Sequence, residues 1–226
     1  MTFAEQVIGF HRKLKPNWKI PKEIGLIYPF EQEETWEVFE TFYHKYFSDQ
    51  NQRTFLFGIN PGRLGAGVTG VPFTDPKILE NVIGIKNTFH KRNELSALFV
   101  YDMIDALGGV KKFYKNYYIT SVCPLGFIGK RKNVNYYDQK DLQEAVEPHI
   151  IKNIKTQIKF GANIKVAFSM GQGKNFKYLK KLNDNHQFFE EIQPLPHPRW
   201  VMQYRLKRKQ EYIDEYALKL TAAIKK

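Results

Sequence analysis

Two short segments hold the residues best suited to act on a polar bond. Residues 58–73 read GINPGRLGAGVTGVPF, a glycine-rich stretch that follows an apolar run and carries one uncharged amide, Asn60. An asparagine has no useful basicity, but its carbonyl can hold a water while its amide holds a main-chain group. Residues 194–200 read PLPHPRW, in which two prolines fix where the His197 imidazole points. A neutral histidine can donate a hydrogen bond to an oxygen that gains negative charge during a reaction. Each segment alone is typical of an ordinary loop, but their joint occurrence after strands indicates a site.

The elements that would position these residues alternate between strand and helix. Apolar and β-rich runs predict strands at residues 53–59, 116–122, 164–169 and 188–193. Helical spacing predicts helices at residues 2–14, 33–47, 93–107, 138–160, after residues 171–173 and at 204–224, with Pro148 dividing or kinking the fourth. This alternation predicts a three-layer α/β/α fold with a central, mainly parallel four-stranded sheet. Ligands of such sheets bind beyond the carboxyl ends of the strands, so we expect residues 58–73, 121–127 and 194–200 to converge.

Composition narrows the class of protein. The 226 residues contain no Ser/Gly/Pro-rich linker and no repeat, so one domain spanning residues 1–226 is expected. The net charge of +12 favours a polyanionic partner. Cys123 is the sole cysteine, which excludes an internal disulfide, a four-cysteine zinc site and a cysteine-bound iron–sulfur cluster, and no metal or cofactor is expected. No apolar run approaches the length of a membrane span, and residues 1–15 resemble an amphipathic helix rather than a signal peptide. A cytoplasmic monomer is therefore expected.

The glycine-rich segment also carries a family resemblance. GINPG at residues 58–62, followed by TGVPF at residues 69–73, resembles the first motif of the uracil-DNA glycosylase superfamily. GINPG alone is equally similar to the mismatch-specific glycosylases, and TGVPF favours the single-strand-selective monofunctional uracil-DNA glycosylase branch. VCPL at residues 122–125, VAFSMGQG at 166–173 and His197-Pro198 resemble later motifs of the family in order. The resemblance covers roughly residues 50–205 and points to a divergent bacterial subgroup called type two.

The resemblance implies a role for each matched position. Asn60 would orient the attacking water, and His197 would hydrogen-bond the leaving uracil. Phe73 would stack on the extruded base, while Ile59 and Gly62 would line the pocket with main-chain groups. The residues that would contact DNA are Pro61, Gly171, Gln172, Lys174, Arg199, Trp200 and Arg205, of which the glycine–glutamine pair lies at a helix N-terminus suited to phosphate. Basic groups at residues 130–132, 174–181 and 199–209 add candidates for phosphate contacts.

The sequence departs from the family pattern at two positions. Ser121 stands where the family has its base-reading asparagine, and a hydroxyl cannot present the same donor-plus-acceptor edge. Reading of uracil would then need a water or another asparagine, such as Asn133. The second catalytic motif also runs directly from His197-Pro198 into Arg199. The wedge that fills the space left by an extruded base would be rebuilt from Arg199, Trp200, Val201 and Met202.

These features favour a metal-independent, monofunctional DNA glycosylase of base-excision repair. It would flip out uracil or a related deaminated or damaged base and hydrolyse its bond to the sugar. No lysine stands out within a motif, so a Schiff-base lyase mechanism is not supported. Asp75, in a Thr-Asp-Pro turn, is expected to be structural. A catalytically weak or inactive nucleic-acid-binding protein of the same fold is the alternative, and Ser121 favours it. A nucleotide-binding enzyme is a third hypothesis, but the chain lacks a G-x-x-x-x-G-K loop.

Overall fold

The computed structural model describes residues 1–224, and a parallel sheet lies at its centre. The four strands follow the order β3-β2-β6-β7, and every neighbouring pair is parallel. At their carboxyl ends Gly58 lies beside Ser121, and Met170 lies beside Leu195. The strands are β2 (Thr54–Gly58), β3 (Tyr117–Ser121), β6 (Val166–Met170) and β7 (Glu191–Leu195). The predicted four-stranded parallel sheet is confirmed.

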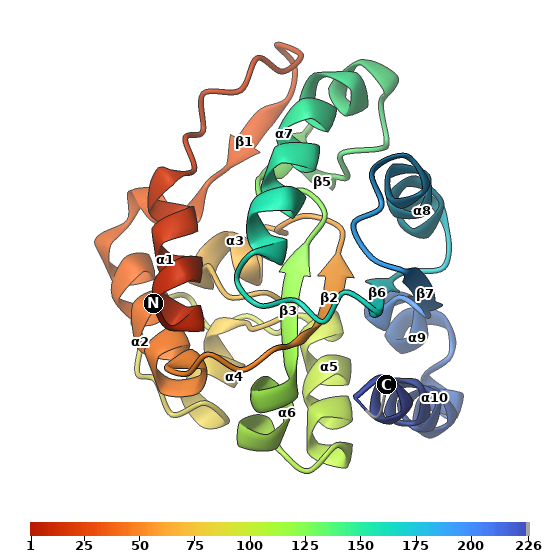
Figure 1. Ribbon diagram of the computed structural model, residues 1–226. Coiled ribbons are helices and arrows are strands. Elements are labelled where there is room, and N and C mark those ends of the chain that lie inside the picture. The colour runs from red at the N-terminus through yellow and green to blue at the C-terminus, as the bar shows by residue number, and fades with distance from the viewer. Residues whose placement is uncertain (225–226) are drawn as a thin grey trace.

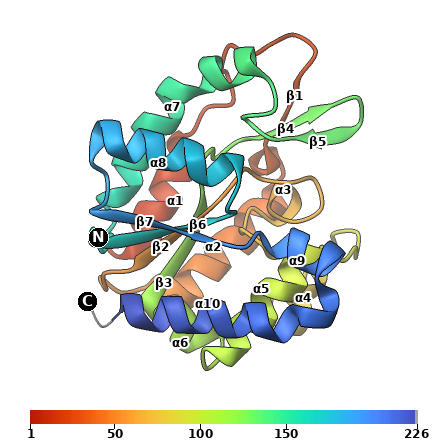
Figure 2. The ribbon, with the colours of Figure 1, turned by 90° about the vertical axis from the view of Figure 1, so that its right-hand side faces the viewer.

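Helices cover both faces of this sheet. Figure 2 shows it nearly edge-on, with α7 (Lys140–Ile158) and α8 (Lys174–His186) on one side and α5 (Leu95–Ala106), α6 (Val110–Asn116) and α10 (Lys209–Ala223) on the other. Beyond β3, α1 (Phe3–Lys13) packs against α2 (Glu33–Phe47) (Figure 1). The shorter helical segments are η1 (Pro29–Glu31), α3 (Ala66–Thr69), α4 (Pro76–Asn81), α9 (Pro198–Tyr204) and η2 (Leu206–Arg208). The arrangement is the predicted three-layer α/β/α fold.

A second, antiparallel sheet lies near the carboxyl ends of the main strands. It consists of β1 (Gly25–Ile27), β4 (Gly126–Gly129) and β5 (Lys132–Val134), in the order β1-β4-β5. These strands are only three or four residues long, too short for the alternating or continuous apolar pattern by which strands are recognised in sequence. This sheet was not predicted from the sequence, although it forms one side of the candidate site.

The main strands form because their residues are apolar on both faces. All five residues of β2, TFLFG, are buried, as a parallel strand between two helical layers requires. At the N-terminus, α1 begins with a capping box in which the Glu5 N–H donates to the Thr2 side chain and the Thr2 N–H donates to the Glu5 carboxylate. The positions of β2 and of the start of α1 therefore follow from local sequence.

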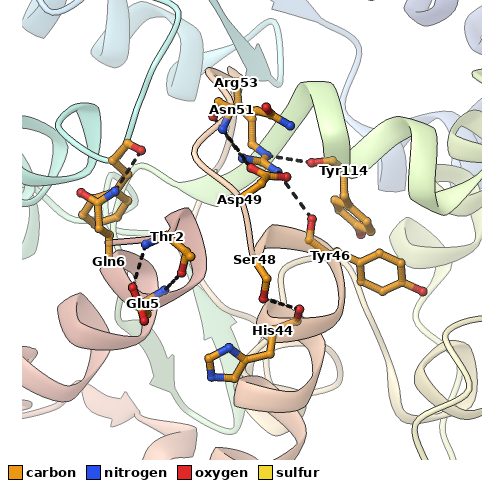
Figure 3. A network of polar contacts seen from close by, with 11 residues as sticks. Thr2, Glu5, Gln6, His44, Tyr46, Ser48, Asp49, Asn51, Arg53 and Tyr114 are labelled. Atoms are coloured by element: carbon orange, nitrogen blue, oxygen red, sulfur yellow. Dashed lines mark hydrogen bonds and ion pairs between the residues drawn. The ribbon is translucent and has the colours of Figure 1, made fainter.

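The start of β2 is anchored by a fully buried arginine. The Arg53 guanidinium donates to both carboxylate oxygens of Asp49, at 2.8 and 2.9 Å, and its Nε donates to the Tyr114 carbonyl at 2.7 Å (Figure 3). The rings of Phe3 and Phe47 lie 4.6 and 4.7 Å from the guanidinium carbon. A buried cation is tolerated only when it is paired and hydrogen-bonded, and this one is. The network thereby ties β2 to α1, α2 and α6.

The helices differ from the sequence predictions at two places. Of the two effects expected from Pro148, a division of the helix is not observed: Pro148 lies inside α7, whose buried apolar face, including Leu142, Val146 and Ile154, packs against the core on both sides of the proline. The terminal helix does not begin at residue 204. Instead, α9 starts directly after His197, and α10 starts at Lys209, because Arg205 leaves the helical conformation with φ −136°. Helices α3, α4 and α6 were not predicted.

Candidate active site

The loop after β2 holds Asn60 in one orientation. Its side-chain amide donates to the carbonyl of Val134 at 3.3 Å and lies 3.4 Å from that of Pro61. Its side-chain oxygen accepts from the N–H of Tyr136 at 3.1 Å. Donor and acceptor are thereby assigned without ambiguity, since each end of the amide faces a main-chain group of the opposite kind. The oxygen retains a second lone pair, which is able to accept a hydrogen bond from a water.

The loop after β7 holds His197 at the N-terminus of α9. The N–H of Arg199 donates to the imidazole Nδ1 at 3.1 Å, so the proton of the neutral ring is on Nε2. Burial, with a smaller contribution from the Arg199 charge, lowers the pKa of His197 to about 4. At neutral pH this histidine is therefore an uncharged hydrogen-bond donor through Nε2.

Phe73 faces His197 from a tight turn. Its backbone is left-handed, with φ 52°, and its ring centroid lies 6.5 Å from that of His197. The turn is fixed by Thr69, whose hydroxyl donates to the Thr74 carbonyl at 2.7 Å. A Cβ on Gly58 would come within 3.0 Å of the Phe73 ring, so a glycine at this strand end is what lets the ring lie over the backbone. The aromatic ring is placed at the end of β2, on the side where Asn60 lies.

Buried hydrogen bonds connect the Asn60 region with the loop beside His197. Tyr136, whose N–H binds Asn60, donates its hydroxyl to the Asn175 side-chain oxygen at 2.8 Å. Asn175 donates to Ser169 at 3.2 Å, and the Ser169 hydroxyl donates to the Gly171 carbonyl at 2.9 Å. A Cβ on Gly171 would lie 3.7 Å from the His197 ring. This series of contacts joins the ends of β2 and β6 and the first turn of α8 into one frame.

These groups surround a cavity of about 570 Å³, a size typical of ligand pockets. Asn60 and His197 come from different strand ends but line the same cavity. The predicted site residues in its wall are Ile59, Asn60, Gly62, Phe73, Gly171, Gln172, Lys174, His197, Arg199 and Trp200. The predicted convergence of the loops after β2 and β7 is therefore observed.

Three predicted site residues do not line this cavity within the described part of the chain: Pro61, Ser121 and Arg205. Ser121 is the last residue of β3, and its neighbour in register is Gly58, over which the Phe73 ring lies. The Pro61 carbonyl faces the backbone of Gly126, where a Cβ would approach it within 2.3 Å. The Arg205 guanidinium lies 5.0 Å from the centre of the Trp200 ring, just outside the wall.

The wall also contains polar residues that sequence reasoning did not place there. Asn133 was named only as a substitute base reader, and Asn135 and Tyr137 follow it on the same segment. Glu94 and Ser96 enter from the start of α5. A run of asparagines before a tyrosine pair, at residues 133–137, was the available signal for the first group. Nothing in the sequence marks the second group, because it lies at the start of a helix that is remote in sequence from every motif.

Glu94 is a titratable carboxyl in the wall. The Ser96 hydroxyl donates to its Oε1 at 3.0 Å, and burial raises the pKa of Glu94. A Cβ on Gly65 would come within 1.9 Å of the other carboxylate oxygen, so the motif loop packs directly on this group. Asp75, by contrast, caps α4 by accepting from the N–H groups of Lys77 and Ile78, as a structural role predicts.

The arrangement of residues 1–224 bears on metal binding and on membrane insertion. Among these residues, no three His, Cys, Asp or Glu side chains group closely enough to hold a metal ion. None of the helices in this range has the length and apolarity needed to cross a bilayer.

Known proteins resemble the chain in sequence and in structure. The profile of the Uracil DNA glycosylase superfamily matches residues 44–221. The crystal structure of wild-type SMUG2 from Pedobacter heparinus is similar over 100% of both chains, with 45% sequence identity and a TM-score of 0.97. A comparison with curated proteins finds no match. The resemblance found in the sequence is confirmed, and the chain belongs to the uracil DNA glycosylase superfamily.

Proposed function

We propose that this protein is a monofunctional DNA glycosylase that removes uracil or a related deaminated or damaged base in base-excision repair. The observation that carries the proposal is that Asn60 and a neutral His197, from the ends of β2 and β7, line one cavity. Family membership supports a uracil-DNA-glycosylase type of activity. The whole chain, residues 1–226, acts as one domain on DNA, as a monomer and without a cofactor.

Hydrolysis of an N-glycosidic bond needs a placed water and a stabilised leaving group. The free lone pair of the Asn60 oxygen orients the water, while its amide stays bound to Val134. His197 Nε2 donates to the oxygen of the departing base as negative charge develops there. Phe73 stacks on the extruded base, and the main chain of Ile59 and Gly62 closes the pocket around it. The oxocarbenium-like sugar needs little nucleophilic help, so no strong base is required in this mechanism.

DNA lies across the mouth of the cavity. The segment that leads into α8, from Gly171 and Gln172 to the first helical residue Lys174, offers N–H groups and a cation to a phosphate. Arg199 and Trp200 enter from α9 and serve in the wedge, with Arg205 stacked on the indole ring. Such a surface gives binding that weakens steeply with salt.

The activity is tested on labelled oligonucleotides that hold uracil, hypoxanthine, xanthine or 5-hydroxymethyluracil. Alkali cleaves any abasic site that forms, and activity should persist in a chelator. Asn60→Ala and His197→Ala should lose rate by at least 100-fold with DNA affinity retained, because both residues act on the bond being broken. No product should be trapped by borohydride, since water and not an amine attacks the sugar. If wild-type protein binds DNA tightly but neither it nor any variant forms abasic product, the alternative of an inactive DNA-binding protein is established.

The position of Ser121 makes base recognition a separate question. Because Ser121 does not line the cavity, we propose that an asparagine of β5 or of the segment that follows it reads the base edge, with Asn133, in β5, the first candidate. Asn133→Ala should then change the ranking of bases, whereas Ser121→Ala should not. Faster uracil removal by Ser121→Asn would instead show that the serine limits base reading.

A further inference from the structure

The hairpin formed by β4 and β5 ends in a turn that suits its residues poorly. Lys130 and Arg131 occupy the two turn positions with φ 48° and 63°. Asparagine and glycine adopt this left-handed conformation readily in two-residue hairpin turns, whereas long side chains disfavour it. Backbone strain of this kind gathers at functional positions. The two turn positions are therefore occupied by cationic residues, although other residue types would adopt this conformation more easily.

The tip of the hairpin concentrates positive charge. Lys130, Arg131 and Lys132, here called the basic tip, are all exposed. Within residues 1–224, none of the three has an ion-pair partner. The Arg63 guanidinium donates to the Arg131 carbonyl at 2.7 Å and adds a fourth cation beneath the tip. The four charges are held together without acidic side chains to neutralise them.

The hairpin is fastened to the loop that carries Asn60. At its base, the backbone of Gly126 packs on the Pro61 carbonyl, where a Cβ would approach within 2.3 Å. Further out, the Asn133 side-chain oxygen accepts from the Arg63 N–H at 3.3 Å. Together with the bond from Asn60 described above, these contacts run along most of the hairpin. The basic tip is thus held at a fixed place relative to the cavity.

That place is beside the cavity mouth. Asn133 lines the cavity, and the tip begins one residue away from it. At about 3.3 Å per residue the backbone of the tip lies within roughly 10 Å of Asn133, which corresponds to at most about three nucleotides at 3.4 Å per nucleotide of one strand of a duplex. Figure 2 shows β4, β5 and α9 at the same end of the molecule, and Asn133 of β5 and Arg199 of α9 both line the cavity.

We propose that the basic tip, with Arg63, binds phosphates of the DNA strand that carries the target base, within about three nucleotides of it. The proposal rests on the proposed function, because it takes the cavity as the place where the base enters. The hairpin then contacts that strand on one side of the cavity, and the first turns of α8 and α9 contact it on the other; together we call them the clamp.

The test compares two triple variants with equal charge loss. One is Lys130→Gln/Arg131→Gln/Lys132→Gln in the tip, and the control is Lys152→Gln/Lys155→Gln/Lys159→Gln on the exposed side of α7. Binding is measured by fluorescence anisotropy on a single-stranded oligonucleotide with one 2′-fluorinated deoxyuridine, whose glycosidic bond resists hydrolysis. The salt concentration is varied in both series.

The tip variant should bind on the order of 30- to 100-fold more weakly at 0.1 M salt, and its salt slope should fall by about 2, since each phosphate contact to a single strand contributes about 0.7. The control should change affinity less than 3-fold. Single-turnover rates at saturating protein should agree within about 2-fold for both variants. A slope equal to that of the control, or an effect confined to duplex DNA, overturns the proposal.

A second variant separates charge from folding. Lys130→Asn/Arg131→Gly supplies the residues that the turn geometry favours, so the thermal midpoint should hold or rise while DNA affinity falls. Unchanged affinity in this variant overturns the proposal even if the triple variant is misfolded. Wild-type protein that binds through the tip but releases no base refutes the proposed enzymatic function and supports the clamp.

Discussion

The protonation state of His197 makes a quantitative prediction about the effect of pH. With a pKa of about 4, the imidazole is neutral through the physiological range. At pH 6 about 1% of the molecules would carry a protonated ring, against about 75% for a histidine with the ordinary pKa of 6.5. If neutral His197 is the form that assists base departure, the rate should stay level from pH 8 to about pH 5 and halve only near pH 4.

The physical cause of the lowered His197 pKa can be tested by removing the smaller of its two causes, the charge of Arg199. Burial is the larger cause, and the charge of Arg199 is the smaller. Arg199→Gln removes that charge while the main-chain N–H that binds Nδ1 remains. The pKa of His197 should then rise but stay well below 6.5. The assay is the rate at subsaturating substrate, which reports the free enzyme, combined with an NMR titration of the imidazole.

Acid unfolding sets the lowest pH at which this experiment can be done. The direction in which stability changes with pH follows from the same lowered pKa. His197 and His11 have pKa values lowered to about 4 and about 3 by burial, so below pH 6.5 the unfolded chain takes up protons first. Stability is therefore lost as the pH falls from 6.5 through 4, by about 3 kcal/mol for His197 alone, at 1.36 kcal/mol per unit. Circular dichroism must show folded protein at each pH used. An acid limb or an NMR midpoint near 6.5 in folded protein would refute the reasoning.

Three substitutions test the packing behind the site. Gly126→Ala places a methyl group within 2.3 Å of the Pro61 carbonyl oxygen, a backbone atom that cannot move aside as a flexible side chain can, so stability in urea should fall by about 1–3 kcal/mol, and an unchanged midpoint would contradict this packing. Tyr136→Phe removes the hydroxyl bound to Asn175, which should cost about 1–3 kcal/mol and slow base release without weakening DNA binding; equal loss of both would indicate a general structural defect. Arg53→Lys breaks the bidentate ion pair and the stacked ring contacts, which should cost about 3 kcal/mol in denaturant; a loss below 1 kcal/mol would show that the network adds little.

The sequence was sufficient for the features that depend on local pattern. Buried parallel strands need apolar residues on both faces, so runs such as residues 54–58 were visible. Because the carboxyl ends of parallel strands share one rim, the meeting of Asn60 and His197 could be predicted from their places after strands. Phe73 was recognised only through its motif, since an isolated phenylalanine in an aromatic-rich chain indicates core.

The features that depend on tertiary packing could not be predicted. The side-chain direction at Ser121 depends on how β3 ends against β2, and a motif position does not contain that information. Glu94 reaches the cavity through contact with Gly65, which lies 29 residues earlier in the chain. The strands of the β1-β4-β5 sheet are too short to leave a periodic signal. The start of α9 at Pro198 was not predicted from the sequence, although a proline suits the first turn of a helix.

The way in which Asn60 is held has an evolutionary consequence. The carbonyl of Val134 and the N–H of Tyr136, which bind its side chain, are main-chain groups. Every amino acid supplies the carbonyl, and every amino acid except proline supplies the N–H. If Asn60 orients the attacking water as proposed, neighbouring side chains on the same segment, such as those of Asn133 and Asn135, can be exchanged without moving that water. Under the proposed function, substitutions at these positions could change which base is recognised while the hydrolytic step stays intact.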